Sequence, residues 1–285
     1  MARTALPPRE EREPAPRLTD QFVGTGTYER LESAGQMGAL GLRVISLAVR
    51  PPFTWWREAV LQASIAVRRS IVPLTLSHMA FLFGFLIILF GEILSIIGVS
   101  EREATATFLF WSREIGTWIT SMIFAGIVGA AITADLGARR IREELDALAV
   151  LGVDQVRSLV VPRVIACTVM TPVLVLVSIT MVNAVNYIAY PPMVGPSPGV
   201  VKDVVAQAVL PLDLLFPVLV KNLLIGFVMG VVACHKGLTC KLGTEGVGRA
   251  VNQTVLISFF ACWMINSFFN LTYLSLYPDA AAVRG

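Results

Sequence analysis

Charged residues inside strongly apolar segments are the first candidates for chemistry in this chain. Arg113 and Glu114 stand early in one such segment, Glu92 stands late in another, and Lys221 lies within a third. A charge at the bilayer centre costs about 2.5–3.5 kcal/mol on insertion scales, so such residues usually face a cavity or a partner. Arg113 and Glu114 are adjacent and point about 100° apart on a helix, so they cannot both face one partner. All of these residues except Lys221 could instead extend toward the outer interface.

Residue patterns for catalysis, metal binding and nucleotide binding are weak. The two histidines, His78 and His235, belong to no hydrolase or metalloprotease motif. Cys234, His235 and Cys240 form a cluster whose spacing matches no zinc pattern, and a helix end is its simpler interpretation. No G-x-x-x-x-G-K-[ST] loop occurs, and the glycines of residues 243–249 favour a tight turn with close helix packing. We therefore expect no metal, no cofactor and no catalytic residue on this chain.

The elements that must position these residues are membrane helices. Hydrophobic residues make up 55% of the 285 residues and charged residues 15%, against about 25% charged in a soluble domain. Apolar stretches long enough to cross a bilayer alternate with short charged loops. Because lipid cannot satisfy a free backbone N–H or C=O, helices are favoured. The sequence predicts an all-α integral membrane fold with five transmembrane helices, at residues 71–97, 108–134, 158–189, 213–235 and 249–277.

The residues outside these spans divide into three segments. Residues 1–34 mix Arg, Glu and Pro without an apolar signal-peptide core, and we expect a disordered cytoplasmic tail. Residues 35–70 hold apolar stretches, Pro51-Pro52, two tryptophans and several arginines, which suits an N-terminal amphipathic helix in the membrane interface. A sixth spanning helix is the alternative, and the arginines argue against it. Residues 278–285 would form a periplasmic C-terminal tail.

Basic residues indicate the orientation of the chain. The 135–157 loop is rich in arginine, the 236–249 loop carries Lys236, Lys241 and Arg249, and the opposite loops carry few basic residues. Basic loops favour the cytoplasmic side. The N-terminus is therefore expected in the cytoplasm and the C-terminus outside, which an odd number of spans also requires. The net charge of +3 with no basic stripe gives no indication of nucleic-acid binding.

The loop between the second and third predicted spans carries a short amphipathic pattern at residues 138–152. Ile141, Leu145 and Leu148 recur at i, i+4 and i+7, which is one face of a helix. Charged residues cover much of the remaining surface: Arg139, Arg140, Glu143, Glu144 and Asp146. Such a helix is either a connector lying on the membrane surface or a plug that docks into a cytoplasmic partner. These residues alone favour neither interpretation.

Six clusters in order carry a family resemblance: Arg113-Glu114-Ile-Gly, Phe124-Ala-Gly126, Thr133-Ala-Asp-Leu-Gly137, Glu144-Leu-Asp-Ala-Leu148, Gly152-Val-Asp154 and Val161-Pro-Arg163. Together with the 243–249 loop they resemble the MlaE/YrbE family of ABC-transporter permeases over roughly residues 40–277. The chain looks most like the YrbE permeases of actinobacterial (mycobacterial) Mce lipid transporters.

The resemblance implies a non-catalytic permease subunit that moves a fatty acid, sterol or phospholipid across a bacterial inner membrane. ATP and Mg would be bound by a partner ABC ATPase dimer, and a second YrbE-type permease and Mce-domain substrate-binding proteins would complete the assembly. In the family the helix at 138–152 is the coupling helix that sits in a groove of the ATPase.

The resemblance also places charges near a lipid cavity or subunit interface. The matched residues are Arg113, Glu114 and Lys221, and some relatives carry an acid where this chain has Asn266. That departure leaves Lys221 without an obvious partner from the last helix.

Small residues indicate close helix packing. Gly226 and Gly230 form one small-xxx-small pair, and Ala125 forms another with Gly129 beside Gly126. These pairs could pack helices within the chain or across a permease dimer.

Two other functions remain open at this stage. An ion-coupled secondary transporter or channel would use Glu92, Glu114 and Lys221 as its path, although no inverted repeat is visible. A lipid acyltransferase would need a nucleophile and base that the sequence does not supply.

Overall fold

The computed structural model describes residues 25–98, 103–194, 199, 202–203 and 214–277. These residues form helices and no strand. Five helices are long and apolar enough to cross a membrane: Trp56–Phe85, Ala106–Ile141, Val156–Val185, Leu215–Leu238 and Thr244–Leu276. The all-α integral membrane fold with five transmembrane helices is therefore confirmed. The chain divides into two compact units, Met1–Ala39 and Leu40–Gly285, and the second unit holds all five of these helices.

Helix α2 (Thr25–Val49) precedes the spans. Residues 25–34 are helical, although we expected them in a disordered tail. All prolines of that expected tail lie before residue 25, and the residues that follow include the helix formers Glu, Leu and Ala. α2 ends before Pro51-Pro52, because proline lacks the N–H that continues a helix. Residues 1–24 and the predicted C-terminal tail at 278–285 lie outside the described residues.

The first span begins earlier than predicted. α3 (Trp56–Phe81) runs directly into the π-helical segment η1 (Leu82–Phe90) and α4 (Gly91–Ile96). Residues 56–70, which we assigned to an interfacial helix, therefore belong to the spanning helix. No glycine or proline interrupts these residues, so the helix continues through them, and the arginines at 68 and 69 lie exposed along it.

The other spans are nearly continuous helical runs whose bounds differ by a few residues from the predicted ones. The second span consists of α5 (Glu103–Phe110), η3 (Trp111–Ile115), α6 (Gly116–Phe124), η4 (Ala125–Gly129) and α7 (Ala130–Ile141). The short helix α8 (Glu144–Val150) follows, then η5 (Val156–Val160) with α9 (Val161–Val194). The fourth span is η6 (Leu214–Val220) with α12 (Lys221–Leu238), and the fifth is α13 (Thr244–Leu276).

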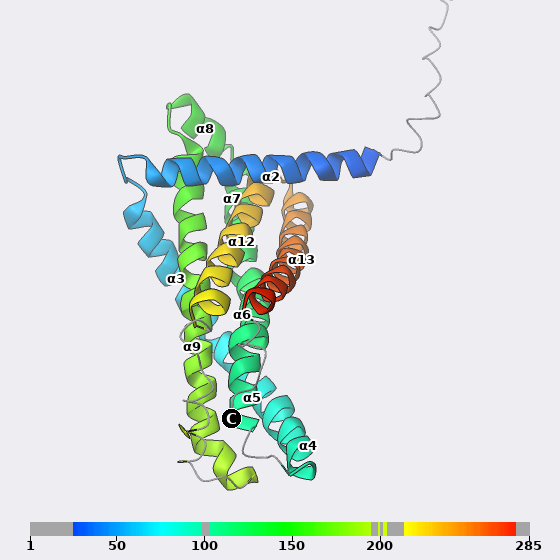
Figure 1. Ribbon diagram of the computed structural model, residues 1–285. Helices are drawn as coiled ribbons and strands as arrows, with labels where there is room; N and C mark the ends of the chain where they lie inside the picture. The colour runs from blue at the N-terminus through cyan, green and yellow to red at the C-terminus, as the bar shows by residue number, and fades with distance from the viewer. Residues whose placement is uncertain (1–24, 99–102, 195–198, 200–201, 204–213, 278–285) are drawn as a thin grey trace, which may run out of the picture. The chain divides into compact units, whose positions relative to one another are not determined.

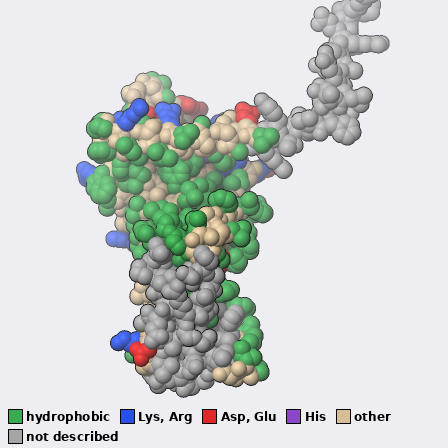
Figure 2. All heavy atoms as spheres, viewed as in Figure 1, with side chains coloured by type: hydrophobic (Ala, Val, Ile, Leu, Met, Phe, Trp, Pro, Cys, Tyr) green, Lys and Arg blue, Asp and Glu red, His purple; other side chains and the backbone are tan. Residues whose placement is uncertain are grey.

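Helix α12 is central to the packing and lies against α9, α13 and α7, while α3 packs on α9 (Figure 1). α8 stands at one end of the bundle, and α4 and α5 lie toward the other. The part of the face that Figure 2 colours is largely hydrophobic over the helices, and most of its charged side chains lie near the α8 end. This distribution suits a bundle whose sides face lipid.

Candidate functional site

Lys221, the first residue of α12, lies inside the bundle and is 0% exposed. Its ammonium donates to the backbone oxygen of Arg113 in the second span and to Asn270 Oδ1 in the fifth, at 3.4 Å. A buried ammonium is tolerated only where acceptors replace its water shell. Lys221 therefore holds three spans together from the start of its own helix.

Glu114 stands opposite, in η3, and accepts hydrogen bonds from the side-chain amides of Asn266 and Asn270. Asn270 thus donates to the carboxylate through Nδ2 and accepts from the Lys221 ammonium through Oδ1. We call Glu114, Lys221, Asn266 and Asn270 the polar cluster. It joins the second, fourth and fifth spans through one amide bridge.

Asn270 was missed by the sequence analysis, which left Lys221 without a partner from the last helix. That expectation is wrong, because Asn270 lies one turn beyond Asn266 and supplies the acceptor. The i, i+4 spacing of the two asparagines on an apolar helix is a signal that could have indicated this shared face.

Arg113 and Glu114 point in different directions, as their adjacency requires. Arg113 Cζ lies 5.9 Å from the centre of the Tyr273 ring, whereas Glu114 faces the asparagines. Both residues are in the π-helical segment η3, which Gly116 follows. A Cβ at Gly116 would stand 2.7 Å from the Trp111 backbone oxygen, so this wide turn requires glycine.

The segment expected to be one coupling helix is broken. α7 continues to Ile141, a turn follows, and α8 begins at Glu144 after Glu143 takes a left-handed conformation with φ 58°. The predicted common face therefore does not extend across both parts. Ile141 is 37% exposed at the end of α7, whereas Leu145 on α8 is buried within the chain at 6%.

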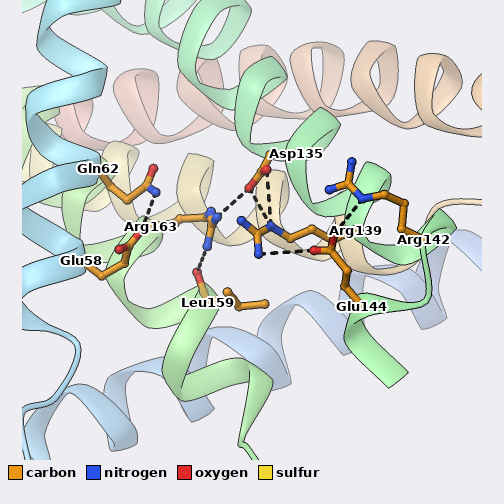
Figure 3. Close-up of polar contacts among 8 residues, drawn as sticks. All are labelled: Glu58, Gln62, Asp135, Arg139, Arg142, Glu144, Leu159 and Arg163. Atoms are coloured by element: carbon orange, nitrogen blue, oxygen red, sulfur yellow. Dashed lines mark hydrogen bonds and ion pairs between the residues drawn. The ribbon is translucent and has the colours of Figure 1, made fainter. Parts of the chain in front are cut away.

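A chain of ion pairs connects α8 to the second and third spans (Figure 3). Arg163 of α9 donates to Asp135 of α7 at 2.6 Å, and Arg139 contacts the same carboxylate at 3.4 Å. Arg139 also lies 3.6 Å from Glu144 on α8, which Arg142 contacts at 2.7 Å. Because Arg163 is only 3% exposed, the inner end of this chain is fixed within the bundle.

The remaining residues assigned to coupling take separate positions. Arg140 donates to the backbone oxygen of Leu238 at the end of α12. Glu143 and Asp146 are exposed, and Leu148 is half-buried. The apolar side chains that α8 and its end present outward are instead Val150, 89% exposed, and Leu151, 76% exposed.

The predicted packing glycines behave differently from one another. A Cβ at Gly226 would stand 2.5 Å from the Cys167 backbone oxygen, and one at Gly230 would stand 3.0 Å from Val164 Cα. These two glycines therefore let α12 and α9 approach closely within the chain. A Cβ at Gly129 would make an ordinary contact 3.6 Å from Thr254, and one at Gly126 would meet nothing within 4 Å.

The remaining candidates are possible metal ligands, the glycines of residues 243–249 and Glu92. Within the described residues no group of three or more His, Cys, Asp and Glu side chains could hold a metal ion. Gly243 takes φ 95° directly before α13, and Gly246 lies against the Lys241 backbone, as a tight turn requires. Glu92, part of the ion-path alternative, is exposed on α4, whereas Glu114 and Lys221 meet in the polar cluster.

The sequence of this chain is similar to those of known proteins. The family model described as Permease MlaE matches residues 60–272. A probable ABC transporter permease protein of Rickettsia bellii is 27% identical over 236 residues, which are 83% of this chain and 90% of that protein.

Two further relatives match over shorter stretches. The chloroplastic protein TRIGALACTOSYLDIACYLGLYCEROL 1 of Arabidopsis thaliana is 32% identical over 177 residues, 61% of this chain and 50% of that protein. A probable ABC transporter permease protein of Synechocystis is 34% identical over 157 residues, 55% of this chain and 59% of that protein. The chain thus covers less than two thirds of the length of either of these relatives.

Proposed function

Because the chain belongs to the MlaE permease family, we propose that it is the membrane-spanning subunit of an ABC transporter that moves lipids across a bacterial inner membrane. Relatives named as probable ABC transporter permeases support the transporter, and a relative named for a galactolipid supports lipid as cargo. ATP and Mg would be bound by a separate ATPase dimer, because the chain has no P-loop of its own.

The observation that carries this proposal is the exposed end of α8 and its connection to the bundle. Val150 and Leu151 expose apolar surface beyond the spans, while Glu144 on the same helix is joined through Arg139 and Asp135 to α7 and α9. A subunit that binds the exposed end of α8 would therefore move the second and third spans together. Apolar residues carry most of the affinity at such contacts, and the surrounding charges set register and rate.

Leu151→Asp is the sharpest test of ATPase docking. Leu151 faces outward, so the substitution should leave the permease folded while placing a charge in the docking contact. We expect at least a tenfold loss of ATPase capture in a pull-down from membranes, with a matching loss of lipid transport. Leu145 is unsuitable for this test because it is buried against its own chain.

Ile97→Asp is the matched control, because Ile97 is also an exposed apolar residue, at 63%, but follows α4 at the other end of the bundle. This variant should retain the ATPase. Normal capture and transport by Leu151→Asp, with normal insertion in the membrane, would leave α8 as a connector and remove the coupling role.

The rest of the assembly is our proposal from the sequence resemblance to Mce transporters. We place a second permease, a paralogue or an identical copy, beside this chain and Mce-domain proteins on the periplasmic side. The polar cluster would lie near the lipid cavity or at the permease interface. Purification of the native complex, followed by mass spectrometry of its proteins and lipids, should find these partners. A complex that contains the ATPase without any Mce-domain protein would contradict the Mce assignment.

A further inference from the structure

A cavity of about 240 Å³ lies between α3, α7 and α9, near the end of the bundle that carries α8. Its apolar wall includes Ile65, Val128 and Ile132, and charged residues from all three helices line the remainder. The charged lining consists of Glu58, Arg69, Asp135, Arg139 and Arg163. An apolar wall beside both signs of charge suits an amphipathic ligand that is itself zwitterionic.

Two of these charged residues already bind each other. Arg163 donates to Asp135 at 2.6 Å and to the Leu159 backbone oxygen at 2.7 Å, and it is 3% exposed. This pair forms a fixed wall. Arg139 is held less tightly, because its contacts with Asp135 and Glu144 measure 3.4 and 3.6 Å.

The other two charges are available to a ligand. Arg69, which lines the cavity, has no hydrogen-bond or ion-pair partner among the described residues. Glu58 accepts from Gln62 at 2.7 Å through Oε1, which leaves its Oε2 without a partner within that same part of the chain. An arginine within a membrane span is costly unless a counter-charge is near, and a phosphate can supply one through two parallel hydrogen bonds.

The order of the charges along α3 gives the ligand a direction. Glu58 lies in the first turn, near the α8 end, and Arg69 follows it by about 16 Å along the helix axis. Side chains on a helix lean toward its N-terminus, so the Arg69 guanidinium points back toward Glu58 and the α8 end of the bundle. A ligand with a cationic group outermost and an anionic group beneath it would match this order.

Apolar side chains continue beyond Arg69 on the same face of α3. Val72 and Leu76, three and seven residues further, are 62% and 65% exposed. A hydrocarbon chain could therefore leave the cavity along this face.

We propose that this cavity binds the head group of a glycerophospholipid that carries a primary amine, with the phosphate on Arg69 and Arg139 and the ammonium on Glu58. The site goes beyond the transport function proposed above, because binding requires neither the ATPase nor turnover. The placement of this cavity in the cytoplasmic leaflet rests on the orientation predicted from the basic loops.

Native mass spectrometry of the full-length chain, purified in detergent and titrated with dioleoylphosphatidylethanolamine, tests the proposal. Arg69→Gln should weaken binding about tenfold or more, because a charge-assisted contact is lost. Arg68→Gln is the matched control, since Arg68 is exposed on the same helix but does not line the cavity. Arg69→Lys keeps the charge but loses the paired hydrogen bonds, so its binding should fall between that of the unsubstituted chain and that of Arg69→Gln.

Further probes separate the parts of the ligand. Glu58→Gln should weaken binding of phosphatidylethanolamine severalfold and leave dioleoylphosphatidylglycerol, which has no amine, unchanged. Dioleoylglycerol, which lacks the phosphate, and O-phosphoethanolamine, which lacks the chains, should each bind more weakly than the intact lipid.

Three results would overturn the assignment: equal binding by Arg68→Gln and Arg69→Gln, dioleoylglycerol binding as tightly as phosphatidylethanolamine, or O-phosphoethanolamine doing so. The last result would indicate a site for a soluble phosphate ester rather than a lipid. None of these measurements depends on ATPase capture, so they are independent of the test of the proposed function.

Discussion

At the scale of single residues, the polar cluster shows how a lysine and a carboxylate are accommodated inside a membrane bundle. Asn270 is neutral, yet it offers a donor to Glu114 and an acceptor to Lys221. Asn266 gives the same carboxylate a second donor. An acid at position 266 would replace that donor with a negative charge beside Glu114. The amide is therefore the side chain that suits this arrangement.

Lys221→Met should impair lipid transport and destabilise the bundle. The substitution keeps an unbranched apolar stem but leaves the Arg113 carbonyl and Asn270 Oδ1 without their buried donor. Each acceptor left in this way costs about 1–3 kcal/mol. Thermal unfolding of the purified permease and transport in proteoliposomes measure the two effects.

Lys241→Met provides the comparison for this experiment, because Lys241 is exposed in the turn before α13. It should change neither measurement. Equal stability and equal transport of Lys221→Met and the unsubstituted chain would remove Lys221 from the functional site.

At the scale of elements, the α7–α8 turn shows where the hydrophobic pattern predicts less than the backbone requires. Ile141, Leu145 and Leu148 satisfy the spacing of one helical face, and the pattern contains no glycine or proline to indicate a break. Glu143 nevertheless takes a left-handed conformation, in a position where its side chain is exposed. As a result, Leu145 is buried against its own chain, and the exposed apolar side chains are those of Val150 and Leu151.

Gly226→Ala and Gly126→Ala should affect the stability of the isolated chain differently. A methyl group at Gly226 would overlap the Cys167 backbone, so we expect a loss of about 1–3 kcal/mol in stability from overpacking. A methyl group at Gly126 meets nothing in the described structure and should leave stability unchanged or slightly raised. Thermal unfolding of both variants in detergent gives the comparison.

The same two variants test which glycine packs against a second permease. If Gly126→Ala weakens association between permeases in a crosslinking or co-purification assay while Gly226→Ala mainly weakens the single chain, the two glycines serve different interfaces. Equal stability of Gly226→Ala and the unsubstituted chain would contradict the close approach of α12 to α9.

At the scale of the whole molecule, the number of spans follows from apolar length alone, because the backbone must satisfy its hydrogen bonds inside lipid. The meeting of Asp135 with Arg163, or of Glu114 with Asn270, does not follow in this way. Those pairs lie on different helices, and only the tertiary packing decides which faces meet. The predicted start of the first span was wrong for a related reason. The arginines at 68 and 69 suggested the membrane interface, but the helix continues through them.

The orientation of the bundle is the prediction that belongs to the whole molecule. The basic loops predict that the α8 end lies in the cytoplasm and the α4 end outside. Glu143 and Ile97 are exposed at these two ends, and the native cysteines at 167, 234, 240 and 262 are buried, so single added cysteines can be labelled over a low background. In intact cells an impermeant maleimide should label Ile97→Cys and leave Glu143→Cys unlabelled, whereas both should react after the membrane is opened. Labelling of Glu143→Cys from outside, with Ile97→Cys protected, would reverse the topology and with it the side on which α8 could meet an ATPase.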